Sequence, residues 1–125
     1  SRPMSEYVVE ANRETIVLAI IESREAIENI RDILSVHDLD GVIMGAGDLS
    51  QDMGYPGQTG HPEVEAAFQK ALDLGIDSGK AFGSVIRAGE TPEQYLTRGV
   101  SILLTSAFSI LANGAKGFVS KVKSL

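Results

Sequence analysis

The chain has 125 residues, of which 43% are hydrophobic, and it carries a formal net charge of −6. This apolar fraction is enough for the core of one domain, and the negative charge disfavours nucleic acid or an anionic membrane as a partner. Cysteine is absent, which excludes disulfide bonds, thiolate nucleophiles and cysteine-ligated metals. No apolar stretch approaches the roughly 20 residues of a membrane span, and the first residues show no export signal, so we expect a cytoplasmic protein.

Four strand-and-helix units follow an initial helix, which is expected at residues 5–13 with Tyr7 and Val8 facing inward. An apolar run at 16–22 predicts the first strand, and Ser23 is placed to cap the helix behind it. Apolar residues at helical spacing mark the buried face of that helix, namely Ala26, Ile27, Ile30, Ile33 and Leu34.

The second and third units repeat this order. The second strand is expected at 41–46, and a loop rich in Gly and Pro leads to a helix in which Pro62 suits the first turn. The buried face of that helix is expected to comprise Val64, Ala67, Phe68, Ala71 and Leu72. The third strand is expected at 80–86, and its helix is predicted to begin at Thr91 and to end at Gly99.

The fourth unit combines a strand at 100–105 with a last helix, which is expected to bury Leu111, Ala115, Phe118, Val119 and Val122. Short apolar strands that alternate with amphipathic helices predict an α/β fold with a parallel sheet, in a single unit spanning 1–125. Four such units suit either half of a (β/α)8 barrel or a small open flavodoxin-like sheet, and composition does not separate the two.

Two carboxylates, Glu22 and Asp48, follow the first two strands. Ligands bind at the C-terminal ends of parallel strands, and neighbouring strands lie about 4.8 Å apart, so we expect both side chains to reach one ion. Oxygen ligands without cysteine favour Mg²⁺ or Mn²⁺ over zinc. The backbone at Gly45, Ala46 and Gly47 leads into a helix start, an arrangement that suits an anion beside the metal.

Simpler interpretations stand beside this one. A Glu that ends a strand and an Asp that follows Gly are often helix-start residues. A Rossmann nucleotide site at Gly45 is disfavoured, because Ser50 replaces the third glycine of G-x-G-x-x-G. Arg87 is expected at the ligand end, where it either meets an acidic substrate tail or remains a solvated loop cation. His61 either caps a helix or contributes to the site.

Three segments of the chain resemble the HpcH/HpaI aldolase family. Residues 21–30 match the family pattern I-E-[ST]-x-x-[AG]-[IVL]-x-N-[IVL], and residues 61–64 match H-P-x-V. Residues 40–50 match D-G-[IV]-x-x-G-P-[AG]-D-L-S, except that Ala46 replaces the proline. The resemblance implies a (β/α)8 barrel of the phosphoenolpyruvate/pyruvate superfamily, of which this chain is the C-terminal half.

Members of this family are class II aldolases, which cleave or form 4-hydroxy-2-oxo acids through a pyruvate enolate stabilised by a divalent metal. The resemblance implies that Glu22 and Asp48 bind Mg²⁺, Mn²⁺ or Co²⁺, and that the amides of Gly47 and Asp48 hold the pyruvate carboxylate. It also implies that the catalytic Arg and His lie in the first half of the barrel, so the isolated chain is expected to be inactive. Members exchange a helix between subunits, which implies a homo-oligomer with residues 108–123 packed on a neighbour.

The resemblance leaves two alternatives open. One is another lyase of the superfamily, such as a citramalyl-CoA lyase, although the H-P-x-V segment favours the aldolase branch. The other is a non-catalytic half-barrel that binds a ligand or a partner half, an interpretation that turnover by the isolated chain would exclude. Ala107 also departs from the family, because it stands where members carry the Asp of a G-S-D segment.

Overall fold

The computed structural model describes residues 2–87 and 89–124, and at its centre lies one parallel sheet. Its strands stand in the order β1-β2-β3-β4, with the bounds Leu18–Ile21, Gly41–Met44, Ala81–Val85 and Ile102–Leu104. Each strand lies inside the range expected from the sequence, and each is shorter than that range. The register pairs Ile21 with Met44 and Met44 with Ser84, so the first two strands end level and β3 extends one residue further, to Val85.

The strand order separates the two folds that remained open. A flavodoxin-like sheet has the order 2-1-3-4-5, with a reversal of direction after the first strand. Here each strand pairs with the next one in sequence, and all pairs are parallel. This continuous progression is the arrangement of successive units in a (β/α)8 barrel, so the flavodoxin-like alternative is wrong.

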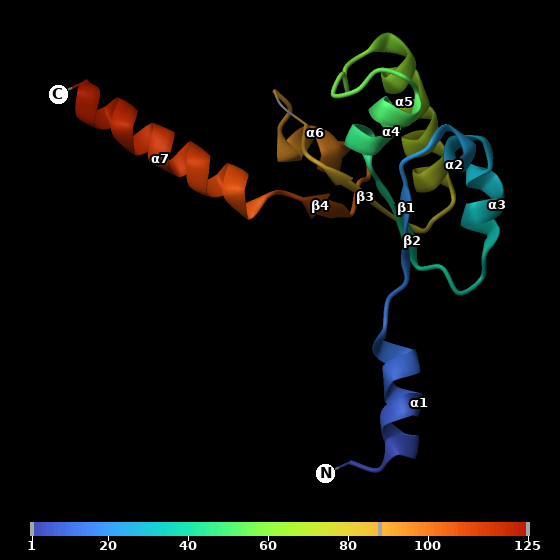
Figure 1. Ribbon diagram of the computed structural model, residues 1–125. Helices are drawn as coiled ribbons and strands as arrows, with labels where there is room; N and C mark the ends of the chain where they lie inside the picture. Colours follow the sequence, from blue (N-terminus) through green and yellow to red (C-terminus); the bar gives the residue numbers. More distant parts are fainter. Residues whose placement is uncertain (1, 88, 125) are drawn as a thin grey trace.

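Seven helices occur within the described residues, and α2 to α6 lie around the sheet (Figure 1). Their bounds are α1 Met4–Glu14, α2 Arg24–Glu28, α3 Ile30–Ser35, α4 Ala46–Asp52, α5 Pro62–Asp77, α6 Pro92–Thr97 and α7 Ala107–Lys123. The single helix expected after β1 is divided into α2 and α3 at Asn29. The side-chain amide of Asn29 donates to the Glu25 carbonyl at 3.0 Å, a local bond of the kind that competes with a regular helix.

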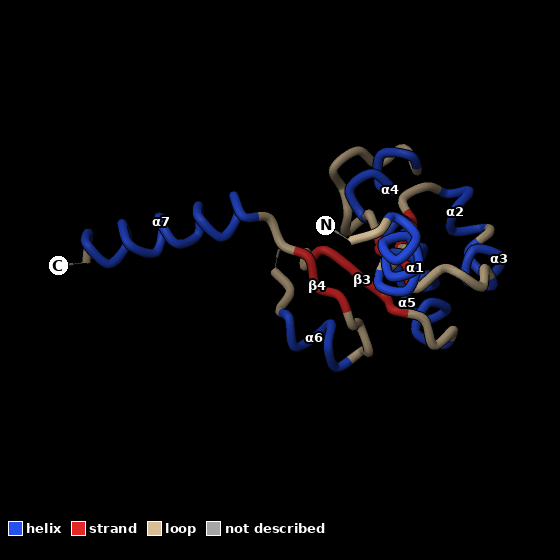
Figure 2. The backbone as a smooth tube through the Cα atoms, turned by 90° about the horizontal axis from the view of Figure 1, so that it is seen from below, coloured by secondary structure: helices blue, strands red, loops and turns tan. Residues whose placement is uncertain are grey.

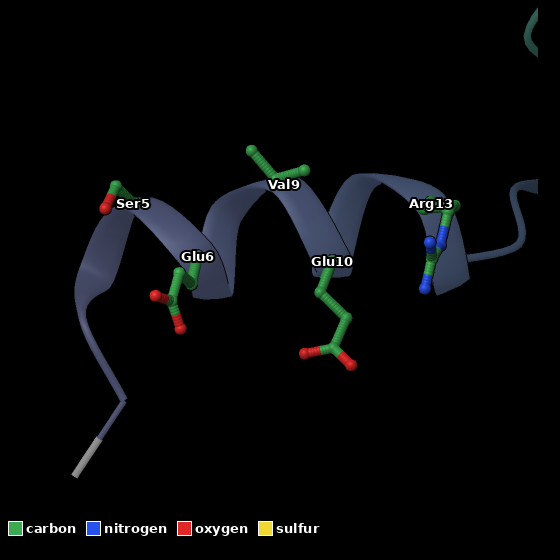
Figure 3. Close-up of a pocket in the computed structure, with 5 residues that line it drawn as sticks. All are labelled: Ser5, Glu6, Val9, Glu10 and Arg13. Atoms are coloured by element: carbon green, nitrogen blue, oxygen red, sulfur yellow. The ribbon is translucent and has the colours of Figure 1, made fainter.

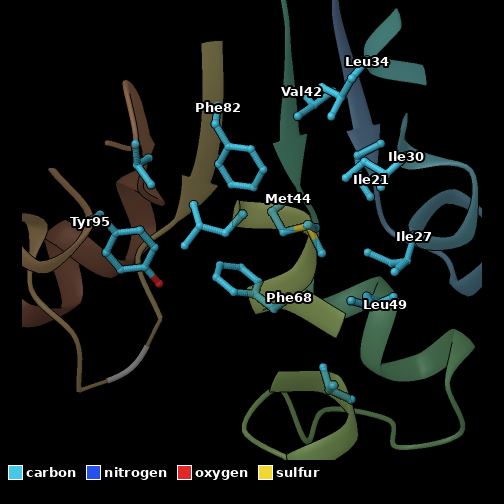
Figure 4. Close-up of a cluster of buried hydrophobic side chains, with 14 of the residues drawn as sticks. Ile21, Ile27, Ile30, Leu34, Val42, Met44, Leu49, Phe68, Phe82 and Tyr95 are labelled. Atoms are coloured by element: carbon cyan, nitrogen blue, oxygen red, sulfur yellow. The ribbon is translucent and has the colours of Figure 1, made fainter. Parts of the chain in front are cut away.

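The core lies between one face of the sheet and the helices that cover it. Ile21, Val42, Met44 and Phe82 are almost fully buried there, together with Phe68 of α5, and Figure 4 shows these side chains converging. The expected helix faces are confirmed: Ile27, Ile30, Leu34, Val64, Phe68, Ala71 and Leu72 are buried, and Ala26, Ile33 and Ala67 are packed against them.

The opposite face of the sheet is open. Ile20 is 56% exposed and Val85 is 49% exposed, although their neighbours Ile21 and Ser84 are buried. Side chains alternate between the two faces of a strand, so the odd and even positions of β1 meet different surroundings. In a complete barrel, this open face would be the interior.

The first and last helices project away from the body of the molecule (Figures 1 and 2). Neither has a buried residue, and the apolar side chains expected to be buried are exposed: Tyr7, Val8, Leu111, Phe118, Val119 and Val122, as well as Ala115. The expectation of burial is therefore wrong for this chain by itself, because the surface that would cover these faces is not among the described residues. Within that part of the chain, no helix is long and apolar enough to cross a membrane.

Candidate functional site

Glu22 stands at the C-terminal end of β1, on the open face of the sheet. The residue before it, Ile21, points into the core, and the alternation of a strand turns Glu22 to the same side as Ile20. Its side chain is half-buried, and Ser23 follows as the N-cap of α2, with its Oγ accepting from the Ala26 amide at 3.1 Å. The cap predicted for Ser23 is thus confirmed, and it fixes the backbone immediately after Glu22.

Gly45 lies directly beside Glu22 on the neighbouring strand end. Its amide donates to the Ile21 carbonyl at 3.0 Å, which continues the β1–β2 pairing by one step. A Cβ atom at Gly45 would lie 2.8 Å from the Cβ and 2.9 Å from Oε2 of Glu22. The absence of a side chain is therefore what leaves room for the Glu22 carboxylate at this point.

Asp48 occupies the first turn of α4, three residues after Gly45, and it is exposed. The first helical hydrogen bond of α4 runs from the Leu49 amide to the Gly45 carbonyl, so the amides of Ala46, Gly47 and Asp48 precede it. Gly47 is exposed and Ala46 is half-buried. These amides lie at the positive end of the helix, where an anion is favoured.

The Glu22–Gly45–Asp48 site, as we call this group, is rich in negative charge. The ion pairs found in the described part of the chain include neither Glu22 nor Asp48. No group of three or more His, Asp or Glu residues suited to a metal ion occurs in residues 2–87 and 89–124. Glu22 and Asp48 thus lie after neighbouring strand ends as expected, and their role as metal ligands stays a prediction.

Arg87 is not the solvated loop cation that was one of its two sequence-based interpretations, and its contact with a substrate stays a prediction. Its guanidinium packs over the Phe68 ring, 4.3 Å from the centroid, and its side chain is only 13% exposed. It forms ion pairs with Glu65 of α5 and with Glu90, the latter at 2.7 Å. Tyr95 of α6 donates to Glu90 from its hydroxyl group. The side chain thus turns toward the helix layer, where two carboxylates already surround it.

The charges of this Arg87–Glu65–Glu90–Tyr95 cluster reinforce one another. Hydrogen bonds from Arg87 hold the pKa values of Glu65 and Glu90 below the ordinary value. Burial opposes the charge of Arg87, but the hydrogen bonds with Glu90 and Glu65 outweigh it and raise its pKa. Burial, followed by the bond to Glu90, raises the pKa of Tyr95. Arg87, Glu65 and Glu90 therefore stay ionised over the physiological range, and Tyr95 stays protonated.

His61 is the N-cap of α5, and its Nδ1 accepts from the Glu63 amide at 3.4 Å. The ring stacks on Tyr55 with centroids 3.6 Å apart, and the Tyr55 hydroxyl donates to Glu63 at 2.7 Å. Pro62 takes the first position of the helix, as predicted. Of the two interpretations open for His61, the structure favours the helix cap.

Sequence reasoning missed Glu65, Glu90 and Tyr95 as partners of Arg87. Glu65 lies 22 positions before Arg87, so no local spacing connects the two. A hollow of about 390 Å³ at the other end of the chain is lined only by Ser5, Glu6, Val9, Glu10 and Arg13 of α1 (Figure 3). A hollow formed by a single projecting helix encloses no ligand, and it contains none of the predicted site residues.

The sequence from residue 2 to residue 109 matches the family model described as HpcH/HpaI aldolase/citrate lyase. The chain belongs to this family. The 4-hydroxy-2-oxo-heptane-1,7-dioate aldolase of Escherichia coli is 38% identical to it over 117 residues, which are 93% of this chain and 45% of that protein.

Two solved structures agree with the fold. The HpcH/HpaI aldolase of Desulfitobacterium hafniense DCB-2 superimposes with a TM-score of 0.79 at 32% identity, over 100% of this chain and 49% of that chain. The citrate synthase SbnG superimposes with a TM-score of 0.81 at 27% identity, over 98% of this chain and 51% of that chain. This HpcH/HpaI family chain thus spans about half the length of the relatives it matches, and the expected α/β half-barrel class is confirmed.

Proposed function

We propose that this chain is the metal-binding half of a divalent-metal-dependent aldolase, which cleaves a 4-hydroxy-2-oxo acid to pyruvate and an aldehyde. The observation that carries the proposal is the Glu22–Gly45–Asp48 site. Its two acids stand at the ligand end of neighbouring parallel strands, and Gly45 leaves the space that the Glu22 carboxylate occupies. Family membership and the aldolase named among the relatives support the same reaction class.

The residues present fit a hard divalent cation. Two carboxylates leave most positions of an octahedral shell to water and to a chelating 2-oxo acid, which is the usual way in which Mg²⁺ is bound. Mg²⁺ or Mn²⁺ is the proposed ion, and Co²⁺ is a further candidate. When bound, the cation would neutralise the negative charge that develops on the keto oxygen during cleavage.

The chain's own residues would bind and orient the acid. The amides of Gly47 and Asp48 at the start of α4 suit the carboxylate of pyruvate, and Gly45 and Ala46 form the adjoining wall. The hydroxyl of the buried Ser50 donates to the Gly47 carbonyl at 2.6 Å, and this bond fixes the turn that presents the amides. A carboxylate held here would lie next to the cation bound by Glu22 and Asp48.

Proton transfer and polarisation of the keto oxygen are assigned to the other half of the barrel. Arg87 is held by two carboxylates, and His61 caps α5 and stacks on Tyr55. These structural contacts favour placing the acid–base groups of the reaction outside this chain. The partner implied is therefore an N-terminal half-barrel or a neighbouring subunit, packed against the open face of the sheet and against the apolar sides of α1 and α7.

The proposal is tested by assaying the full natural protein for retro-aldol cleavage of 4-hydroxy-2-oxo-heptane-1,7-dioate, with pyruvate measured as product. We expect cleavage in the presence of Mg²⁺ or Mn²⁺, loss of cleavage with EDTA, and recovery when the metal is added back. Residues 1–125 alone are expected to bind the metal without turnover. Activity that is indifferent to EDTA would contradict the proposal.

A second candidate is carbon–carbon bond chemistry on a citrate-type acid. The family model is described as aldolase/citrate lyase, and the fold matches the citrate synthase SbnG over 98% of this chain. The two candidates share the cation and the carboxylate site and differ in the second reactant. Parallel assays with citramalyl-CoA, citrate and the 4-hydroxy-2-oxo acid distinguish them by which substrate releases product.

A further inference from the structure

A bridge between α2 and α4 joins the two elements that carry the acids of the site. Arg24 begins α2, two residues after Glu22, and Asp52 ends α4, one helical turn after Asp48. The Arg24 amide donates to Oδ2 of Asp52 at 2.7 Å, and the Arg24 guanidinium donates to the Met53 carbonyl at 3.2 Å. Figures 1 and 2 both show α2 and α4 close together at the same end of the molecule.

The bridge links the turn that contains Glu22 to helix α4, which contains Asp48. The backbone is bonded on both sides of Glu22. Before it, the Ile21 carbonyl accepts from the Gly45 amide at the next strand end, and after it, the Arg24 amide donates to Asp52 of α4. The helix α4 has only seven residues, and beside its buried Leu49 and Ser50 the Arg24–Asp52 contact is a further attachment, at the end opposite Asp48. Arg24 places a positive charge at that end, where a helix favours a cation.

We propose that Arg24 and Asp52 are positioning residues, which set the separation of the Glu22 and Asp48 carboxylates and thereby the affinity for the divalent cation. The inference rests on the proposed function, because it assigns these residues to the same metal site. The ligand atoms of a metal site must be held within about 0.5 Å of their binding positions. Replacing a residue that orients a ligand typically lowers metal affinity about 10- to 100-fold.

Both residues are exposed, so the alternative is an ordinary surface contact with no effect on the metal. The donor of the shorter bond is a backbone amide, and ordering it requires no side-chain entropy from Arg24. Asp52 is thus the member whose replacement breaks the stronger link. Replacement of Asp52 by Ala removes the bridge. Replacement by Asn removes the charge and keeps an oxygen that can accept the hydrogen bond, so the two variants distinguish the effects of bond and charge.

The experiment measures Mn²⁺ binding to the full natural protein by titration calorimetry and by the EPR signal of free Mn²⁺. Asp52→Ala is expected to raise the Kd about 10-fold. Asp52→Asn keeps an acceptor oxygen and is expected to stay close to the unmodified protein. Arg24→Met keeps the backbone bond and is expected to fall between the two. The control Asp38→Ala removes an equal charge from an exposed acid paired with His37 and is expected to change nothing.

Equal Kd values for Asp52→Ala and the unmodified protein, with thermal unfolding unchanged, would overturn the bridge. An Asp52→Asn variant as weak as Asp52→Ala would also overturn it, because charge rather than positioning would then be responsible. The proposed function fails separately, if the unmodified protein binds no Mn²⁺ or if Glu22→Gln leaves binding unaltered. Failure of the bridge alone leaves the Glu22 result intact.

Discussion

The ligand end of the sheet contains two charged groups that lie on neighbouring strands and differ in how their charges are satisfied. After β1 and β2, Glu22 and Asp48 belong to none of the ion pairs in the described part of the chain. After β3, Arg87 is enclosed by Glu65 and Glu90 and rests on an aromatic ring. Glu22 faces the open side of the sheet, whereas Arg87 turns toward the helices.

The difference shows that position at the ligand end does not by itself assign a charged residue to ligand binding. Glu22 and Asp48 belong to no ion pair within the described residues, which is consistent with the divalent cation proposed for them. The Arg87 cluster already contains its counter-ions, and it fastens the segment after β3 to α5 and α6. The binding function proposed for the first group thus remains to be tested, whereas the contacts of the second group give it a structural function.

The largest effect on folding is expected from Arg87→Met. The change leaves two carboxylates without their shared partner, and hydrogen bonds to charged groups contribute about 2 kcal/mol, reduced here because Glu65 and Glu90 are partly exposed. The free energy of unfolding in urea is expected to fall by about 1 to 2 kcal/mol. Mn²⁺ affinity is expected to stay unchanged in the folded variant. A large loss of affinity without loss of stability would reverse the assignments of the two groups.

Gly45→Ala is expected to have the next largest effect, and it acts on the binding group. The added Cβ would meet Glu22 at 2.8 Å, so the carboxylate must move from its place. We expect an approximately 10-fold rise in the Mn²⁺ Kd, equivalent to about 1.4 kcal/mol. Gly60→Ala is the matched control, because a Cβ there meets nothing within 4 Å and Gly60 lies outside the site. Equal affinities for the two variants would show that Glu22 does not need the space beside Gly45.

The pH dependence of unfolding provides a smaller effect, confined to the Arg87 cluster. The folded pKa values of Glu65 and Glu90 lie below the ordinary value of 4.5, mainly because of hydrogen bonds from Arg87. Their stabilising contribution is therefore complete above about pH 4.5 and is lost as the pH falls through the folded pKa values. We expect the unfolding midpoint to decline more steeply below pH 4.5 in the unmodified protein than in a Glu65→Gln/Glu90→Gln variant. If the unfolding midpoints of the two proteins decline in parallel below pH 4.5, the proposed stabilisation by ionised Glu65 and Glu90 is contradicted.

Features determined by nearby residues were predictable from the sequence. The strand positions, the Ser23 cap, the Pro62 helix start and the buried face of α5 all depend on spacing within one or two turns. The placement of Glu22 and Asp48 at one end of the sheet also followed, because parallel strands bring their C-terminal ends together. The order of the strands could not be predicted, because the half-barrel and the flavodoxin-like sheet use the same local patterns.

Features that depend on distant partners were not predictable. Arg87 and Glu65 come from different units, and the guanidinium is captured because Phe68 and Glu65 lie on one face of α5, one turn apart. The same limit applies to α1 and α7. Their apolar faces were recognised correctly, but periodicity shows which side of a helix is apolar and not which surface covers it.

The central claim is that Glu22 and Asp48 together bind a divalent cation, and Mn²⁺ titration of the full natural protein tests it most directly. Comparison of the unmodified protein with Glu22→Gln and Asp48→Asn retains the size of each side chain and removes its charge. The account predicts saturable binding in the unmodified protein, and loss of measurable binding in both variants with the unfolding midpoint preserved. Unchanged Mn²⁺ affinity in both variants would contradict it.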